Sequence, residues 1–158
     1  DRFRRPPAEG SWENPDYPLH FRTRGGRRIT LTAERGLKPE AIDYLESERW
    51  TALLDEDKIQ FPLILRAPGP GDRFRPLGMR EDKKITRFCT DQKISIKDRS
   101  ELLLLINQKS DIIWCIGIRI ADTVKITRDT RCVLRVKCQF EPEKGIEGRE
   151  RSIPQFFD

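Results

Sequence analysis

Apolar residues that recur at every second position constrain the fold of this chain more than any other feature of its sequence. In residues 132–140 every even-numbered position is apolar, and polar side chains stand between the last four of these positions. Successive side chains of a strand point to opposite faces of a sheet, so this pattern predicts a strand with one buried face. Residues 29–33 and 59–65 alternate in the same way, and Pro62 places the second stretch at a sheet edge or a strand end.

Two continuous apolar runs lie at residues 102–106 and 112–116. The residues between them are all polar, and a turn is predicted at 107–110. Short runs of this kind are typical of strands that are buried on both faces, and the polar separator is typical of a hairpin turn. The chain is therefore predicted to be α+β, with mostly antiparallel strands.

Helices are predicted in three places, two from the spacing of apolar residues and one from a cap. Behind Pro39, a favoured first residue of a helix, apolar residues at 41, 42, 45, 50 and 53 predict one helix. Apolar residues three and four positions after Ile85 predict a second, short helix. Ser95 followed by Asp98 predicts the capped start of a third.

The two ends of the chain have the composition of segments that lie outside a core. Residues 1–28 contain four prolines, which remove backbone donors and favour extended backbone, so we expect a tether or the start of a preceding subdomain. Residues 141–158 are rich in charged residues and predict a flexible tail. The folded domain is expected at residues 29–140. A chain that starts at Asp1 without methionine is expected to be a piece of a longer protein.

The four cysteines and the single histidine are not spaced as metal ligands. There is no Cys-x-x-Cys pair and His20 is distant in sequence from every cysteine, so we expect no metal site. Buried free thiols in a reducing cytoplasm are the simplest interpretation of the cysteines. No apolar run approaches the ~20 residues that a membrane span requires, and we expect a soluble cytoplasmic protein without membrane contact.

Positive charge is concentrated in one segment. Ten basic and five acidic residues lie between Arg66 and Arg99, a surplus of five that equals the net charge of the whole chain. A localised basic surface favours a polyanionic partner such as RNA.

Inside this segment, prolines and glycines at 68–71 turn the chain just before Arg73, Phe74 and Arg75. Two guanidinium groups beside an aromatic ring can hold phosphate oxygens and stack on a base. The alternatives are that Asp72 pairs with Arg73 or Arg75 and that Phe74 belongs to the core. Trp114 follows two isoleucines and is expected in the core.

An ordered set of motifs that begins in this segment and continues beyond it resembles a known family. The set begins with Gly71-Asp72-Arg73-Phe74-Arg75-Pro76-Leu77-Gly78-Met79 and continues with Lys83-Lys84, Asp91, Lys93-Ile94, Arg99, Ile113-Trp114, Gly117, Arg119-Ile120, Lys125-Ile126-Thr127, Thr130 and Val133-Leu134. Over residues 59–136 the chain resembles the C-terminal, tRNA-binding domain of tRNA(Ile)-lysidine synthetases. It departs from the family pattern at Ser95 and Leu103, where proline is usual, which puts local turn geometry in doubt.

The resemblance implies a layered β/β/α fold, similar to a domain of the phenylalanyl-tRNA synthetase beta subunit. It implies that the parent protein is a ligase that uses ATP, with Mg, to join lysine to the wobble cytidine of tRNA(Ile). The Ser-Gly-Gly-x-Asp-Ser motif of the catalytic domain is absent from this chain, which is therefore expected to hold no cofactor and to have no activity alone. The domain is expected to bind the acceptor stem or body of tRNA(Ile).

The site residues follow from the resemblance and from their charge. The candidates for RNA-backbone binding are Arg73, Arg75, Lys83, Lys84, Arg87, Lys93 and Arg119. The residues expected to shape the loop are Gly71, Asp72, Phe74, Pro76 and Gly78. No catalytic residue is assigned, because no second titratable group is evident beside Asp72. An alternative is a structural domain that packs against the parent's catalytic half or against a second copy in a homodimer.

Overall fold

One sheet of the fold is built around the strand predicted at the C-terminal end of the domain. The computed structural model describes residues 9–46 and 48–142, and its four-stranded antiparallel sheet has the order β2-β3-β11-β4. The strands are β2 (Leu19–Arg22), β3 (Arg28–Leu37), β4 (Thr51–Asp55) and β11 (Val133–Phe140). The predicted alternation in β11 is confirmed, because Leu134, Val136 and Cys138 are buried while Gln139 is exposed.

The second sheet has five strands in the order β1-β5-β8-β9-β10 and every neighbouring pair is antiparallel. Its strands are β1 (Glu9–Trp12), β5 (Leu63–Arg66), β8 (Leu104–Ile106), β9 (Ile112–Cys115) and β10 (Arg119–Ile120). All residues of β8 and β9 are buried, as the continuous apolar runs predicted. Trp114 is 2% exposed, so its predicted place in the core is confirmed.

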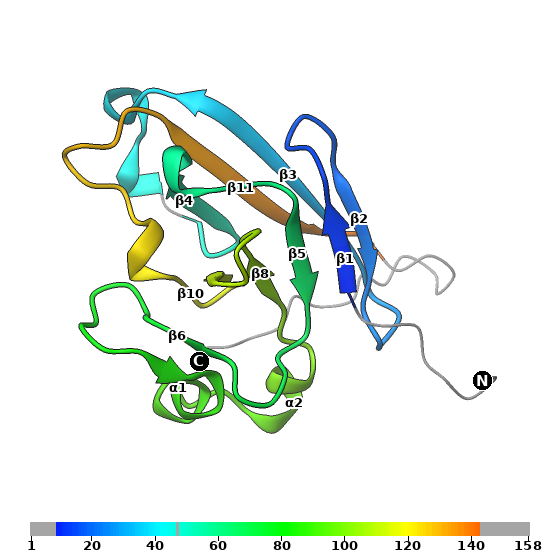
Figure 1. The fold of residues 1–158 in the computed structure, drawn as a ribbon. Helices are drawn as coiled ribbons and strands as arrows, with labels where there is room; N and C mark the ends of the chain where they lie inside the picture. Colours follow the sequence, from blue (N-terminus) through cyan, green and yellow to red (C-terminus); the bar gives the residue numbers. More distant parts are fainter. Residues whose placement is uncertain (1–8, 47, 143–158) are drawn as a thin grey trace.

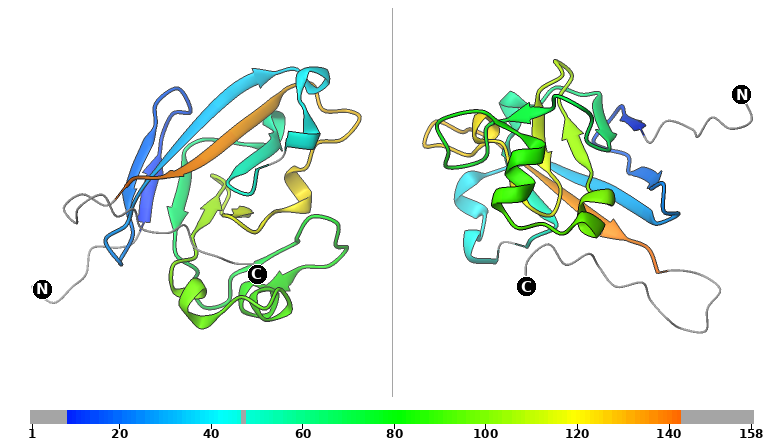
Figure 2. Two further views of the ribbon diagram at one scale, coloured as in Figure 1. Left: turned by 180° about the vertical axis from the view of Figure 1, so that it is seen from behind. Right: turned by 90° about the horizontal axis from the view of Figure 1, so that it is seen from below.

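The helices form a third layer against the five-stranded sheet, which therefore lies in the middle (Figure 1). Helix α1 (Ile85–Asp91) buries its predicted face, and α2 (Ile96–Ser100) begins where Ser95 accepts a hydrogen bond from the Asp98 backbone N–H at 3.1 Å. Figure 2 shows from below that both helices cover the middle sheet. A small ribbon of β6 (Arg73–Phe74) and β7 (Lys83–Lys84) leads into α1. The α+β fold with layers β/β/α is confirmed.

The expected N-terminal tether is wrong for residues 9–22. Two strands, β1 and β2, lie there, one in each sheet. Trp12 is 2% exposed, and its indole N–H donates to the Tyr17 carbonyl oxygen at 2.8 Å. Two of the prolines lie in the turn between the strands, where a missing backbone donor costs nothing. Residues 1–8 and 143–158, which include most of the expected tail, lie outside the described residues.

The helix expected behind Pro39 is also wrong. Two short 3-10 turns, Pro39–Ala41 and Tyr44–Glu46, lead instead into β4. Leu45, which the helical pattern places on a buried face, is 96% exposed. Ala52 and Leu54 are buried at every second position because β4 pairs with β11, and tertiary pairing here overrides a weak helical spacing.

Residues 59–65 form a strand only in part. A third 3-10 turn, Glu56–Lys58, precedes them, and β5 begins at Leu63, directly after Pro62. The fourth 3-10 turn, Asp122–Val124, follows β10. No helix in the described part of the chain is long and apolar enough to cross a membrane.

Candidate nucleic-acid interface

The loop that carries the Gly71–Gly78 run is fixed at its base by an ion pair. Asp72 accepts two hydrogen bonds from the Arg66 guanidinium, at 2.8 and 2.9 Å, and a third from the Gly69 N–H at 2.6 Å. The hydrogen bonds from Arg66 hold the pKa of Asp72 below its usual value. The alternative that Asp72 pairs with an arginine holds, but its partner is Arg66 and not Arg73 or Arg75, because β5 ends at Arg66 and the intervening loop folds back onto it. Arg73 is left facing solvent.

The ribbon of β6 and β7 sorts its residues onto two faces. Phe74 is 4% exposed and packs edge-to-face on Phe88, with 5.0 Å between ring centroids. It therefore belongs to the core and is not available to stack on a base. Arg73 and Lys84 are direct cross-strand partners, both exposed. Neither takes part in an ion pair within residues 9–46 and 48–142. We call the Arg73–Lys84 pair the basic ribbon.

Three other predicted cations are partly neutralised by carboxylates. Lys83 Nζ lies 2.7 Å from an oxygen of Asp91, and Arg87 Nε lies 3.3 Å from the other oxygen. These contacts, the Lys83 hydrogen bond above all, lower the pKa of Asp91. Arg75 Nε lies 3.4 Å from Asp82. The structure thus brings Lys83 and Arg87 to the ribbon and to α1 beside it, but as members of ion pairs.

The two remaining predicted cations lie at the C-terminal end of α1. Arg119, on β10, has its guanidinium carbon 5.3 Å from the centre of the Phe88 ring and donates to the Gln92 side-chain oxygen at 3.4 Å. This side chain is half-buried. Lys93 is exposed, in the left-handed backbone region with φ 57°, directly after the helix.

The second half of the loop is tied to the edge of the middle sheet. Pro76 forms an isolated bridge with Ala121, and the Leu77 N–H donates to the Ile120 carbonyl at 3.0 Å. The Gly78 N–H donates to Asp122 at 3.0 Å, and Gly78 has a φ of 86° that favours glycine. Gly71, with φ 81°, makes the opposite turn of the loop. The predicted loop-shaping residues therefore lie at the turns and anchors of the loop.

The sequence reasoning missed a second group of cations. Arg22, Arg24, Arg27 and Arg28 surround the turn between β2 and β3, with no acidic residue among residues 21–28. The cluster is visible in the sequence over a short window only, because acidic residues before and after it offset its charge over a longer one.

The acidic side chains, the histidine and the cysteines were the other candidates for chemistry in the part of the chain that the structure describes. No three His, Cys, Asp or Glu side chains there are placed to hold a metal ion. The four cysteines are free, as predicted, and three of them are buried. Burial raises the pKa of Cys138 to about 12, so its thiol is a poor nucleophile at neutral pH.

Comparisons with known proteins agree with the motifs and the fold. A family model described as the TilS substrate C-terminal domain matches residues 63–138. A tRNA(Ile)-lysidine synthase of Dehalococcoides mccartyi is 41% identical over 99 residues, which cover 63% of this chain and 21% of that protein. The enzyme of Bacillus subtilis is 27% identical over 147 residues, which cover 89% of this chain and 30% of that protein. The chain thus spans a fifth to a third of the length of these curated relatives.

Among solved structures, a crystal structure of a TilS C-terminal domain aligns with a TM-score of 0.64 at 18% identity. The alignment covers 85% of this chain and 99% of that chain, so the two share a fold. An N-terminal fragment of the phenylalanyl-tRNA synthetase beta subunit from Pyrococcus horikoshii aligns over 56% of this chain with a TM-score of 0.46. The ordered motifs and the matching family model together identify residues 63–138 as a TilS C-terminal domain, the domain found in tRNA(Ile)-lysidine synthases.

Proposed function

We propose that this chain binds the acceptor stem or body of tRNA(Ile) and positions it for a catalytic domain elsewhere in the same protein. The relatives that share the domain are tRNA(Ile)-lysidine synthases, which supports a tRNA as the partner. In this proposal the parent enzyme is a cytoplasmic ligase. Its catalytic domain would hold ATP and Mg²⁺ and attach lysine to the wobble cytidine.

The observation that carries the proposal is the basic ribbon. Like charges directly opposite each other destabilise a strand pair, yet Arg73 and Lys84 are exposed cross-strand partners. An anion bound between them removes this repulsion. A phosphate group fits, because arginine holds two phosphate oxygens at once while lysine supplies a point charge.

The way in which proteins bind a paired RNA stem indicates that this surface suits a stem rather than a single strand. An A-form helix hides its major-groove base edges, so proteins bind it through phosphates, 2′-hydroxyls and shape. Phe74 is buried and cannot stack on an unpaired base. A surface that offers cations without an exposed aromatic ring suits a paired stem better than a single strand.

The test is a filter-binding titration of a tRNA(Ile) transcript at several salt concentrations. The variant Arg73→Gln with Lys84→Gln is expected to weaken binding and to lower the log–log salt slope by about two, one for each lost phosphate contact. The control variant, Lys109→Gln with Arg128→Gln, removes the same charge from two exposed positions away from the helical layer. Equal affinity and slope in both variants would rule out the basic ribbon as the binding site.

A second candidate function rests on a groove between the free edges of the two sheets. It has a volume of about 690 Å³ and its lining includes Tyr44 and Leu77, which are 48% and 41% exposed. Exposed apolar side chains in a groove favour a protein partner, either the catalytic half of the parent or a second copy of the chain. Tight binding of the isolated catalytic domain, lost in Leu77→Asp while RNA affinity is kept, would support this role.

A further inference from the structure

The turn between β2 and β3 presents a second set of cations outside the basic ribbon. Arg22 and Arg28 are cross-strand partners, and Arg24 lies in the turn that joins them. All three side chains are exposed. In the part of the chain that the structure describes, no ion pair involves any of them. We call these three residues the arginine hairpin.

The fourth arginine holds the hairpin in place. Arg27 is 6% exposed, its guanidinium carbon lies 4.3 Å from the centre of the Phe140 ring, and Nη1 lies 3.9 Å from a carboxylate oxygen of Glu101. Glu101 directly follows α2 as its C-terminal cap. The hairpin is therefore docked on the helical layer.

Hydrogen bonds close the turn itself. The Thr23 N–H donates to the Arg27 carbonyl at 2.8 Å, and the Arg27 N–H donates to the Thr23 hydroxyl at 3.1 Å. Gly26 has a φ of 85° and donates to the Thr23 carbonyl at 2.9 Å. A turn fixed in this way presents its arginines without much ordering of the backbone on binding, which favours affinity.

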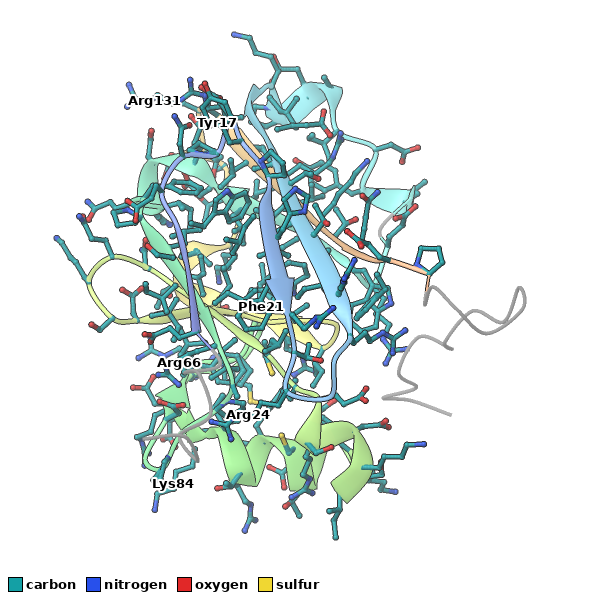
Figure 3. The ribbon with its side chains drawn as sticks, turned by 90° about the vertical axis from the view of Figure 1, so that its right-hand side faces the viewer. Tyr17, Phe21, Arg24, Arg66, Lys84 and Arg131 are labelled. Carbon is teal, nitrogen blue, oxygen red and sulfur yellow. The ribbon has the colours of Figure 1, made fainter. Side chains whose placement is uncertain are left out.

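The arginine hairpin and the basic ribbon lie at the same end of the molecule. Figure 3 shows Arg24 and Lys84 toward the end that carries the helices, while Tyr17 and Arg131 lie at the opposite end. Figure 1 and both views of Figure 2 show the tip of the β2–β3 hairpin beside α2. In the view from below, the helices lie between this tip and the ribbon (Figure 2).

We propose that the arginine hairpin is a second contact for the phosphate backbone of helical RNA, separate from the basic ribbon. This inference rests on the proposed function, because it assigns a second surface to the same RNA partner. Exposed guanidinium groups hold phosphates bidentately, and a helical RNA is recognised through its backbone. Two contacts on either side of α1 and α2 fix the direction of the RNA helix across the domain, which one contact cannot do.

The composition of the hairpin tip favours RNA over a protein partner. Residues 22–28 consist of arginine, glycine and threonine. Protein interfaces derive most of their affinity from a few large side chains buried in pockets, such as tryptophan and tyrosine, with apolar surroundings that exclude water. The exposed Tyr17 lies at the opposite end of the molecule. The tip offers charge alone, which matches a phosphate backbone.

The hairpin also lies outside residues 63–138, the part matched by the family model. It therefore adds a contact to those that the shared domain itself can make.

The test uses the full 158-residue chain, an RNA duplex of about 16 base pairs and a tRNA(Ile) transcript. The hairpin variant carries Arg22→Gln, Arg24→Gln and Arg28→Gln. A control variant carries Arg35→Gln, Arg128→Gln and Arg131→Gln, which removes the same charge from exposed positions remote from the hairpin tip. Filter binding across a salt series gives the affinity and the slope, and circular dichroism confirms that each variant is folded.

The hairpin variant is expected to lower the log–log salt slope by about three on both RNAs, against little change in the control. In phosphate ethylation interference on the tRNA, ethylation of one group of phosphates should no longer impair binding of this variant. For the variant of Arg73 and Lys84, the phosphates whose ethylation no longer impairs binding should form a different group.

Each contrary outcome would overturn a different part of the proposal. A hairpin variant that matches the control overturns the inference, and the proposed function survives if the ribbon variant still loses affinity. Loss of the same phosphates in both variants overturns the claim of a separate contact. Wild-type chain that binds neither RNA overturns the inference together with the proposed function. Unchanged RNA affinity with lost binding to the isolated catalytic domain makes the hairpin a protein contact instead.

Discussion

The basic ribbon and the arginine hairpin both set cations directly opposite each other, but different contacts hold them on the fold. The ribbon is fixed by Phe74, an apolar side chain packed on Phe88. The hairpin is fixed by Arg27, a buried cation between the Phe140 ring and Glu101. A buried charge needs such partners because its desolvation is costly, whereas a buried phenyl ring is stabilised by leaving water. The basic ribbon is thus anchored to the core by a buried apolar side chain, and the arginine hairpin by a buried cation.

The charge around the two elements also differs. Asp82 and Asp91 neutralise cations that flank the ribbon, while no described carboxylate pairs with the three exposed arginines of the hairpin. The basic ribbon therefore offers two cations with carboxylates nearby, and the arginine hairpin offers three that form no ion pair among the described residues. Binding through the hairpin should depend on salt more strongly.

The largest expected effect comes from the apolar anchor of the ribbon. Replacing Phe74 with alanine removes a buried ring and leaves a cavity, and should lower the free energy of unfolding by about 3–5 kcal/mol. Urea denaturation measures this. The matched aromatic control is Tyr17→Ala, at a side chain that is 70% exposed, and should change stability by less than about 0.5 kcal/mol. A loss below about 1 kcal/mol in Phe74→Ala would contradict an apolar anchor.

A smaller effect is expected at the ion pair beneath the ribbon. Asp72→Asn weakens the two hydrogen bonds from Arg66 and should cost about 1–2 kcal/mol at pH 7. The folded pKa of Asp72 is lowered, so its stabilising contribution is present above the unfolded value near 4 and is lost as pH falls through the folded value. The difference between wild type and Asp72→Asn should therefore narrow in denaturation measured below about pH 4. If the difference in free energy of unfolding between the two proteins stayed constant down to pH 2, the charge of the Asp72 carboxylate would not be its source.

The smallest effect has the opposite sign. Lys84→Glu replaces a like-charged pair with an opposite one across the ribbon, and Arg28→Glu does the same opposite Arg22. Each should raise the free energy of unfolding by about 0.2–1 kcal/mol at low salt while weakening RNA binding. The gain should vanish in ~1 M salt, where exposed charges are screened. Destabilisation by either reversal would mean that the opposed cations do not repel each other in the free protein.

Local sequence patterns were sufficient to predict several of the secondary-structure elements. The alternation of residues 132–140, the buried runs of β8 and β9 and the capped start of α2 all depend on neighbours within a few residues. The strands β1 and β2 could not be recognised, because each is four residues long and lies among prolines. β1 is stabilised by pairing with β5, which is distant in sequence, and β2 by pairing with β3, which itself pairs with the distant β11.

The sequence by itself determined the family of residues 63–138, the α+β class, and which cations are candidates for binding RNA. Only the tertiary structure decided that Asp72 pairs with Arg66, that Phe74 is buried, and that Arg73 faces Lys84. Only the tertiary structure, too, placed Arg24 of the β2–β3 turn at the helical end of the molecule. The physical reason is that period and capping act over one or two turns of chain. The partner of a charge, by contrast, is set by how strands far apart in sequence are paired and packed.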